Sequence, residues 1–417
     1  MRITTSKMEL KSSVEYQDVK YLLHNYLIAE IEFDQLDITL ASKQQIITYV
    51  SAKVMKYVAD TDYVLNLSDL NKLTSEMVDE ISGWGPLEQL IKSEHINDIL
   101  VNGADRIFIE KNGKLELTNL RFIDEDHVLR VIRRILAPLG RRVDESSPLV
   151  DARLPDGSRV NIIIPPLALN GSCLSIRKFR KEPFTESDLI AFQTLNQDMM
   201  SFLLNAIEQK VNILVSGGTG AGKTTLLNLL SRSIPINQRI VTIEDAAELQ
   251  LDHIHVVRLE TRPSNLEGVG EVSARDLVRN ALRMRPDRII LGEIRGNEVI
   301  DVLQAMNTGH EGSMSTIHAN NPHDALLRME MLAGLAGFQG AELTLRKMIV
   351  ASVEMIVQIS RLASGERKVT SIIEVVGIRD GDFVINELYS YVPEQKSFLT
   401  HRVSTMNPKL KSLLKGF

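Results

Sequence analysis

The sequence has little cysteine, no long uninterrupted apolar run and no excess of positive charge. A single cysteine, Cys173, among 417 residues excludes an intrachain disulfide framework and a cysteine-rich zinc site, and it fits a reducing cytoplasm. The longest uncharged stretch, residues 160–176, is broken by Pro165 and Pro166, so we expect no transmembrane helix. With 48 Lys and Arg against 54 Asp and Glu, the formal net charge is −6, which argues against a protein whose main task is to bind nucleic acid.

Glycine and proline are missing from the first 80 residues. Within them, residues 16–32 and 43–58 place apolar side chains at three- and four-residue spacings, which indicates helices. We therefore predict an N-terminal helical region over residues 1–79. Hydrophobic residues make up 44% of the chain, which is enough apolar material for folded domains after the helical region.

Loop residues at Gly83, Gly85 and Pro86 mark a change of pattern. Short strand-like runs around a helical stretch at 125–136 then predict an α+β domain over residues 80–180, with a linker at 181–187. From residue 188 to 417 we predict a doubly wound α/β domain. Its expected strands are 212–215, 240–243, 256–259, 289–291 and 313–317, and its expected helices begin at 223, 273, 298 and 322.

Residues 217–224 fit the phosphate-binding pattern G-x-x-x-x-G-K-[ST] between an apolar strand and a predicted helix. Glycines allow backbone N–H groups to converge on phosphate oxygens, the lysine reaches the β- and γ-phosphates, and the threonine hydroxyl binds Mg²⁺. ATP is favoured over GTP because no guanine-selecting N-K-x-D follows the loop. The predicted nucleotide-binding residues are Gly217, Gly218, Thr219, Gly220, Ala221, Gly222, Lys223, Thr224 and Thr225.

Acidic residues follow two of the predicted strands. Glu293 ends the apolar run 288–293, and we expect it to hold Mg²⁺ together with Thr224 or to orient the attacking water. Glu244, Asp245 and Glu248 form a second cluster after the strand 240–243. Three neighbouring carboxylates repel unless they serve a cation or a proton transfer, although a solvated acidic turn is the alternative.

Two histidines and several arginines complete the candidate set. His310 and His318 flank the segment 311–317 and suit a sensor of the γ-phosphate; the alternative is two structural histidines. Arg153, Arg159, Arg177 and Arg180 precede the phosphate loop. A cationic side chain that arrives from another domain stabilises the charge of phosphoryl transfer, and Arg153 and Arg177 are the candidates.

Four blocks occur in one order, at residues 217–224, 242–248, 289–295 and 308–320. They resemble the Walker A, Asp, Walker B and His boxes of the type II/type IV secretion ATPase superfamily. The run 287–296 and the segment 318–322 are similar to the CpaF/TadA branch, which assembles tight-adherence (Flp) pili. The resemblance covers about residues 80 to 390 and includes Gly83–Trp84–Gly85–Pro86 and the segment 151–161.

The resemblance implies a RecA-like P-loop NTPase domain, preceded by a small α+β (PAS-like) domain and the helical region. It implies that Glu248 polarises water, that Glu244 and Asp245 support it, and that Glu293 is the Walker B acid. It also implies that Arg153 and Arg177 close over the nucleotide. The full set of expected catalytic residues is Glu248, Glu293, Glu244, Arg153, Arg177, His310, His318 and Arg295.

Members of the resembled family are cytoplasmic homo-hexamers that hydrolyse ATP with Mg²⁺ and drive inner-membrane platform proteins. The resemblance thus implies a pilus or secretion motor at the cytoplasmic face of the inner membrane, bound there through partners and without direct contact to nucleic acid. One alternative is a type IV secretion or conjugation ATPase that moves DNA or effectors. Another is a nucleotide-gated scaffold with negligible turnover, against which the intact Lys223, Thr224, Glu248 and Glu293 argue.

Overall fold

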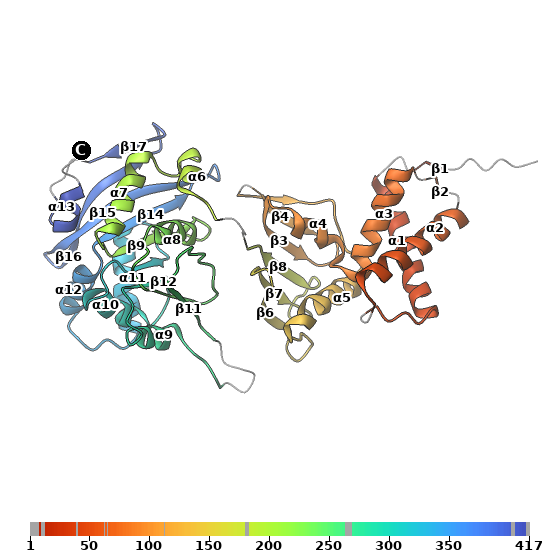
Figure 1. Ribbon diagram of the computed structural model, residues 1–417, viewed down its shortest axis with the longest axis horizontal. Coiled ribbons are helices and arrows are strands. Elements are labelled where there is room, and N and C mark those ends of the chain that lie inside the picture. The colour runs from red at the N-terminus through yellow and green to blue at the C-terminus, as the bar shows by residue number, and fades with distance from the viewer. Residues whose placement is uncertain are drawn as a thin grey trace, which may run out of the picture. The chain divides into compact units, whose positions relative to one another are not determined.

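The computed structural model describes residues 8–9, 13–38, 41–61, 63–64, 66–111, 113–179, 183–262, 269–401 and 405–413. The chain divides into two compact units, residues 1–180 and 181–417 (Figure 1). Arg180 and the first two residues of the predicted linker, 181 and 182, lie outside the described residues.

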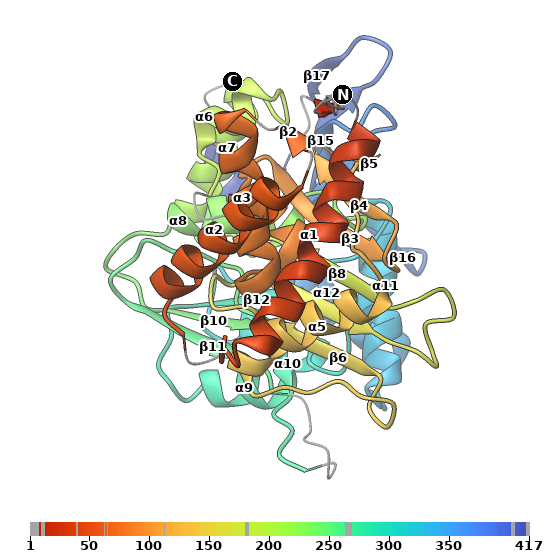
Figure 2. The same cartoon turned by 90° about the vertical axis from the view of Figure 1, so that its right-hand side faces the viewer.

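Three helices open the first unit, as the sequence predicts. They are α1 (Ser13–Phe33), α2 (Lys43–Asp60) and α3 (Leu67–Ser82). They pack on one another around a core that includes Leu23, Val50 and Met77 (Figure 2). Ser42 and Gln45 form a capping box at the start of α2. Their side chains accept hydrogen bonds from backbone N–H groups that have no partner within the helix, which favours a helix start at this point.

A mixed α+β layer follows in the same unit. Its sheet is antiparallel, in the order β5-β4-β3-β8-β7-β6. Six residues of α5 are buried, and the five apolar ones pack with the apolar side chains of β3, β7 and β8 into one core. The elements are the 3-10 turn Gly85–Leu87, α4 (Glu88–Lys92), β3 (Ile96–Asn102), β4 (Ile107–Lys111), β5 (Lys114–Leu117), α5 (Glu125–Leu136), the 3-10 turn Ala137–Leu139, β6 (Leu149–Arg153), β7 (Arg159–Ile163) and β8 (Cys173–Arg177).

A buried ionic group joins α3 to the α+β layer. Glu80 Oε1 lies 2.9 Å from Lys20 Nζ of α1, and Glu80 Oε2 lies 3.0 Å from His127 Nε2 of α5. Burial by itself raises the pKa of Glu80, but the hydrogen bond with His127 and the charge of Lys20 outweigh it and hold the pKa at about 2. This buried group therefore ties the helical region to the α+β layer, whose apolar cores are separate. The predicted boundary at residues 79 and 80 stays a prediction.

The second unit is built on one sheet of nine strands, in the order β11-β10-β12-β13-β9-β14-β15-β16-β17. The strands from β11 to β14 in this order are parallel, and β15, β16 and β17 continue the sheet antiparallel. The strands are β9 (Ile213–Gly217), β10 (Ile240–Glu244), β11 (Val256–Glu260), β12 (Arg288–Ile294), β13 (Met314–Ile317), β14 (Met355–Arg361), β15 (Arg367–Arg379), β16 (Asp382–Val392) and β17 (Ser397–Thr400).

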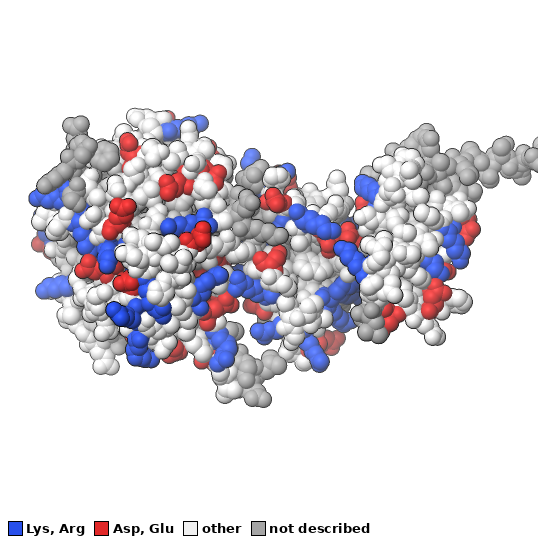
Figure 3. All heavy atoms as spheres, in the orientation of Figure 1, with Lys and Arg blue, Asp and Glu red and all other residues white. Residues whose placement is uncertain are grey.

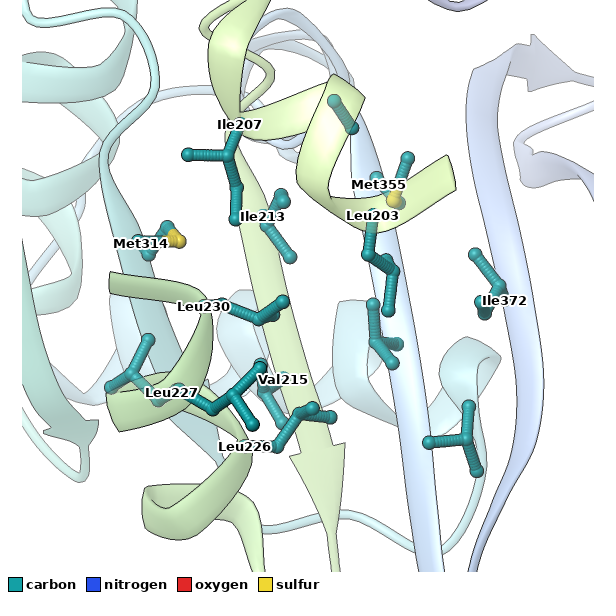
Figure 4. Close-up of a cluster of buried hydrophobic side chains, with 14 of the residues drawn as sticks. Leu203, Ile207, Ile213, Val215, Leu226, Leu227, Leu230, Met314, Met355 and Ile372 are labelled. Carbon is teal, nitrogen blue, oxygen red and sulfur yellow. The ribbon is translucent and has the colours of Figure 1, made fainter. Parts of the chain in front are cut away.

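Helices cover both faces of this sheet, which confirms the predicted α/β class. One face packs on α6 (Glu186–Ala191), α7 (Gln197–Glu208), α8 (Lys223–Arg232) and α13 (Pro408–Leu413). The other packs on α9 (Ala274–Ala281), α10 (Val299–Asn307), α11 (Pro322–Leu335) and α12 (Glu342–Ser352). Figure 4 shows Leu226, Leu227 and Leu230 of α8 turned toward Ile213 and Val215 of β9. Because α8 packs against β9 in this way, the helix starts next to the end of that strand.

The antiparallel strands β15–β17 were not predicted. They lie beyond residue 335, where the sequence analysis made no assignment, and β14 and β15 are joined by a short hairpin at residues 362–366. That hairpin lies beside the loop that follows β9. Among the described residues, no helix is both long enough and apolar enough to span a lipid bilayer.

Candidate active site

The loop between β9 and α8 has the backbone that the glycine pattern predicts. Gly220 and Gly222 have φ angles of +68° and +103°, in the left-handed region that glycine adopts without strain. A side chain at Gly217 would overlap the carbonyl oxygen of Ile359 on the neighbouring β14. Around Gly218, by contrast, the space is open. The loop thus forms a narrow cradle in front of the first turn of α8, where N–H groups and the helix dipole favour an anion.

Lys223 is the first residue of α8 and reaches back over the loop. Its Nζ donates to the carbonyl oxygens of Gly217 and Gly218, at 3.1 Å each, and lies 3.9 Å from Glu293 Oε1. Burial lowers the pKa of the Lys223 ammonium, and the nearby Glu293 opposes that effect. The cation is therefore held at the loop by weak, replaceable partners, which suits a group that binds phosphate oxygens.

Two acids meet at the edge of the sheet where the parallel strands end, here called the carboxyl edge. Glu244 ends β10 and Glu293 lies near the end of β12, the adjacent strand. Gly292 packs against Glu244, where a Cβ would lie 3.2 Å from Glu244 Cγ. Glycine at this position lets the two strands bring their acids together beside the phosphate loop, as the sequence predicts.

Glu244 is 4% exposed and organises the segment that carries Glu248. Its Oε2 accepts hydrogen bonds from the backbone N–H groups of Glu248 and Leu249, at 2.7 and 2.9 Å. Its Oε1 is buried and has no hydrogen-bond partner among the described residues. Burial raises the pKa of Glu244, although these two N–H donors counteract it. Glu248 itself is half-buried.

Arg295 links the two acidic segments at the surface. Its Nε donates to Glu293 Oε2 at 2.6 Å, and its Nη1 donates to Asp245 Oδ2 at 3.2 Å. Its side chain is 62% exposed, so it bridges the two acids from the solvent side. The structure thus brings Lys223, Glu244, Glu293 and Arg295 together at one edge.

The two histidines of the last block do not lie together. His318 directly follows β13 at the carboxyl edge, where Thr316 donates to the carbonyl oxygen of Gly292 at 2.8 Å. His310 precedes β13, whose Met314 pairs with Ile213 at the start of β9. His310 therefore lies at the opposite, amino edge of the sheet. The expectation that both histidines sense the γ-phosphate needs correction, because the strand between them separates His310 from the phosphate loop of its own chain.

The arginines of the first unit form a row across three strands. Arg153 on β6 lies opposite Arg159 on β7, and Arg159 lies opposite Arg177 on β8. Arg177 Nε approaches Asp98 Oδ1 at 3.4 Å. Figure 3 shows Lys and Arg side chains gathered over β6–β8 and α5. The row thus places three cationic side chains at directly paired positions of one sheet. Whether Arg153 and Arg177 act on nucleotide stays a prediction.

Sequence reasoning missed two arginines beside the phosphate loop. Arg361 ends β14 and Arg367 begins β15, across the hairpin. Arg367 Nε donates to the carbonyl oxygen of Gly220 at 3.0 Å. The turn residues Ser364 and Gly365 between two apolar runs were the signal that could have located a hairpin here. The sequence offered no sign that the hairpin lies next to the loop.

The residues at the carboxyl edge fit a nucleoside triphosphate with Mg²⁺. The open cradle at Gly218, the Lys223 cation and the unpartnered Glu244 Oε1 are what a phosphate chain and an attacking water need. Thr224 and Glu293 are the residues that would hold the cation. No group of three or more His, Cys, Asp or Glu side chains in the described ranges is placed to bind a metal by itself. Mg²⁺ commonly takes one or two protein ligands and fills its shell with phosphate oxygens and water.

Comparisons with known proteins match the greater part of this chain to one family and to two relatives. The family described as "Type II/IV secretion system protein" matches residues 80–401. A putative conjugal transfer protein of Mycobacterium tuberculosis is 39% identical over 319 residues, which cover 75% of this chain and 88% of that protein. The conjugal transfer protein TrbB of Rhizobium radiobacter is 31% identical over 301 residues, 71% of this chain and 88% of that protein.

Among solved structures, the ATPase DotB of Yersinia pseudotuberculosis superimposes with a TM-score of 0.51 at 17% identity, over 84% of this chain and 83% of that one. At this identity the likeness shows the fold. It agrees with the doubly wound sheet and the preceding α+β layer described above.

Proposed function

The chain belongs to the type II/IV secretion system protein family, and from this premise we propose that it is the ATP-hydrolysing motor of a pilus or secretion machine. One observation carries the proposal: Lys223, Glu244 and Glu293 converge around the phosphate loop at the carboxyl edge. Cation, buried acid and glycine cradle are the parts that phosphoryl transfer to water requires. A scaffold without turnover would have no use for a buried, partly unpartnered acid beside the loop.

Each residue has a task in this mechanism. The loop N–H groups bind the phosphate chain, and Lys223 exchanges its carbonyl partners for phosphate oxygens. Glu248 orients the attacking water and takes its proton, while Glu244 fixes the backbone of Glu248. Glu293 and the Thr224 hydroxyl would hold Mg²⁺, which when bound would neutralise charge on the phosphate oxygens. Arg295 holds the side chains of Glu293 and Asp245 in position by donating a hydrogen bond to each.

We further propose that the motor works as a homo-hexamer. In this proposal Arg153 and Arg177 close over nucleotide, and closure moves the two units against each other. The proposal draws on the positions of Arg153, Arg159 and Arg177, which place three cationic side chains on neighbouring strands of the first unit. The hexamer drives inner-membrane platform proteins from the cytoplasmic face and binds the membrane through them. The helices of residues 1–79 dock on that machinery or regulate the ring.

Two machines are candidates. The run 287–296 favours a tight-adherence pilus, with pilin subunits as cargo. The names of the Mycobacterium and Rhizobium relatives favour a conjugation system that moves DNA or effectors. Deletion of the gene, with return of either the wild-type gene or Lys223→Ala, separates them. Loss of pili with normal DNA transfer supports the first machine, and the reverse result supports the second.

The enzymatic proposal is tested by the ATPase rate against protein concentration, with particle mass measured on the same samples. We expect specific activity to rise as hexamers form, and Arg153→Ala to lose that rise while staying folded. Lys223→Ala should lower nucleotide affinity at least about tenfold, because charge-assisted contacts to phosphate are lost. Lys114→Ala, on exposed β5, is the matched control. Equal specific activity from a stable monomer would contradict the ring motor, and no turnover at any concentration would contradict the enzyme.

A further inference from the structure

Gln358 connects the strand before the phosphate loop with the segment that follows β13. It lies on β14, directly opposite Ser216 of β9, and it is 2% exposed. Its Nε2 donates to the carbonyl oxygens of Ala319 and Asn320, at 3.3 and 3.1 Å. Because β9 lies between β13 and β14 in the sheet, the side chain has to cross β9 to reach them. One buried amide therefore links three neighbouring strands.

The amide crosses β9 on the face of the sheet that α8 does not cover. Leu214 of β9 and Ile356 of β14 belong to the core formed with α11 and α12. Side chains two residues apart on a strand share a face, so Ser216 and Gln358 lie on that side as well. Serine at position 216 is small and leaves room over β9 that a larger side chain would fill. Since α8 packs on the other face, Gln358 acts from behind the phosphate loop.

The hydrogen bonds of Gln358 hold the backbone that directly follows His318. Before His318, Thr316 donates to a backbone carbonyl oxygen of β12 at 2.8 Å. After it, Asn321 caps the start of α11. Between these two anchors, the Gln358 amide bonds to both carbonyl groups of the connecting segment. The position of the His318 side chain therefore depends on this amide.

A cavity of about 380 Å³ adjoins the segment that Gln358 holds. Asn320, Asn321 and Gln358 line it, and Ser371 and Glu387 are among its other walls. Groups that border a cavity have fewer packed neighbours than groups in a filled core, so packing holds them less firmly. Within the described part of the chain, Gln358 Oε1 is buried without a hydrogen-bond partner. The two bonds from Nε2 are thus what the amide contributes to fixing this segment.

We propose that Gln358 is a positioning residue that sets the preference for ATP over ADP by holding His318 toward the γ-phosphate. The inference rests on the proposed function and on the prediction that His318 senses the γ-phosphate. Without the two hydrogen bonds, the backbone after His318 relaxes toward the cavity and the imidazole moves with it. The loop that binds the other phosphates is built on the opposite face with α8, so it is left in place. Gln358 therefore acts on the affinity for ATP and leaves the affinity for ADP nearly unchanged.

The test compares the full-length wild type with Gln358→Met and Gln358→Asn. Methionine keeps the length of the side chain but donates no hydrogen bond, and asparagine keeps the amide but is too short to cross β9. Dissociation constants are measured for ADP and for the non-hydrolysable ATP analogue AMP-PNP, both with Mg²⁺. Gln358→Met should weaken AMP-PNP binding roughly three- to tenfold, as expected for lost hydrogen bonds, while ADP stays within about twofold. Gln358→Asn should shift the ratio in the same direction.

Ser371→Ala is the matched control. Ser371 lies directly opposite Gln358 on β15 and lines the same cavity, but it donates to Glu387 and makes no bond to the segment after β13. It should change neither affinity. Thermal unfolding of every variant gives the temperature below which it is folded, and all affinities are measured below the lowest of these values. Gln358→Asn, the milder change, carries the test where Gln358→Met is too unstable.

A double variant, His318→Ala with Gln358→Met, separates positioning from a purely structural role. If Gln358 acts through His318, the double variant should prefer ATP as much as His318→Ala alone does, because the second change has nothing left to displace. Steady-state kinetics give an independent measure. In Gln358→Met the KM for ATP should rise while kcat stays within about threefold, since the groups that transfer the proton are intact.

Four results would overturn the inference. Equal weakening of ADP and AMP-PNP would place the effect at the loop, and additive losses in the double variant would mean that Gln358 does not act through His318. Wild-type affinities in both Gln358 variants would mean that the amide positions nothing. An unchanged preference for ATP in His318→Ala would remove the sensor itself. In each case a chain that still hydrolyses ATP leaves the proposed function standing, whereas a wild type that binds neither nucleotide would remove both.

Discussion

Asn212 at the amino edge of the parallel sheet and Glu244 at its carboxyl edge differ in how far their buried polar atoms are hydrogen-bonded. At the amino edge, Asn212 is buried and makes four hydrogen bonds: its Nδ2 donates to the carbonyl oxygens of Met306 and Ser352, and its Oδ1 accepts from the N–H groups of Gly312 and Ser313. At the carboxyl edge, Glu244 Oε1 is buried and has no hydrogen-bond partner among the described residues. Both side chains have buried polar atoms. Those of Asn212 are saturated, which means that each has its hydrogen-bond partners, whereas Glu244 Oε1 has none among the described residues.

The amino edge also anchors the end of the chain. Glu354 accepts from the backbone of Asn212 and from the side chains of Asn407 and Lys409, and the fully buried Glu374 accepts from the backbone of Met406 and Asn407. Carboxylates at this edge thus replace water by protein donors. The difference between these residues teaches that the saturated side chains of Asn212, Glu354 and Glu374 build the fold, while the unpartnered Glu244 Oε1 lies where a ligand would bind.

The largest expected effect is at the carboxyl edge. Glu248→Gln should bind ATP but lower kcat by roughly 10²- to 10⁴-fold, because the group that takes the proton from water is gone. The control is Glu311→Gln, an exposed acid of the amino edge that pairs with Lys409. Steady-state ATPase assays and ADP binding measure both variants. Near-normal turnover of Glu248→Gln would move the base to Glu293 and weaken the contrast between edges.

The second effect is on stability at the amino edge. Asn212→Ala leaves two carbonyl oxygens and two N–H groups without partners, so it should cost about 3 kcal/mol of the free energy of unfolding. Asn320→Ala, an exposed amide after β13, should change stability little. Denaturant unfolding gives both values. A small loss for Asn212→Ala would mean that water replaces the lost bonds and that saturation does not define this edge.

The sequence predicted what depends on neighbouring residues. The cradle at Gly220 and Gly222 and the start of α8 at Lys223 follow from a local pattern, and the structure has them where predicted. The helix α5 also has the predicted limits, because an Asp124 cap and regular apolar spacing set them. The positions of residues that depend on the order and direction of the strands in the sheet could not be predicted. The place of His310 follows from the direction of β13 relative to β9.

The hairpin arginines show the same limit more sharply. Arg361 lies far along the chain from Gly220, and the two meet because β14 pairs with β9. A single sequence carries no signal for that pairing, since β14 is an apolar run like several others. The acids Glu244 and Glu293 could be predicted because each lies at or near the end of a strand of the parallel core, where ligand sites of such sheets gather.

A third prediction uses the titration of Glu244. Burial raises its pKa in the folded chain, so the acid favours folding below the unfolded pKa, and this advantage is lost as the pH rises through the folded value. Glu244→Gln should therefore be at least as stable as the wild type at pH 7, with the two curves converging below about pH 4.5. Its ATPase rate should fall, because Glu248 loses its support. Unfolding curves from pH 4 to 8 test this, and lower stability of Glu244→Gln at pH 7 would place Glu244 with the saturated acids.

The smallest effect separates the histidines. His318→Ala, at the carboxyl edge, should narrow the difference in affinity between ATP and ADP, since a group that senses the γ-phosphate is removed. His310→Ala should leave both affinities within about twofold, because β13 lies between His310 and the loop. Titrations with the two nucleotides measure this on each variant. A loss of ATP affinity in His310→Ala that appears as particles assemble, and is absent at low protein concentration, would mean that the amino edge of one subunit contacts the nucleotide of another. In that case the contrast between the edges would hold within one chain and end at the subunit boundary.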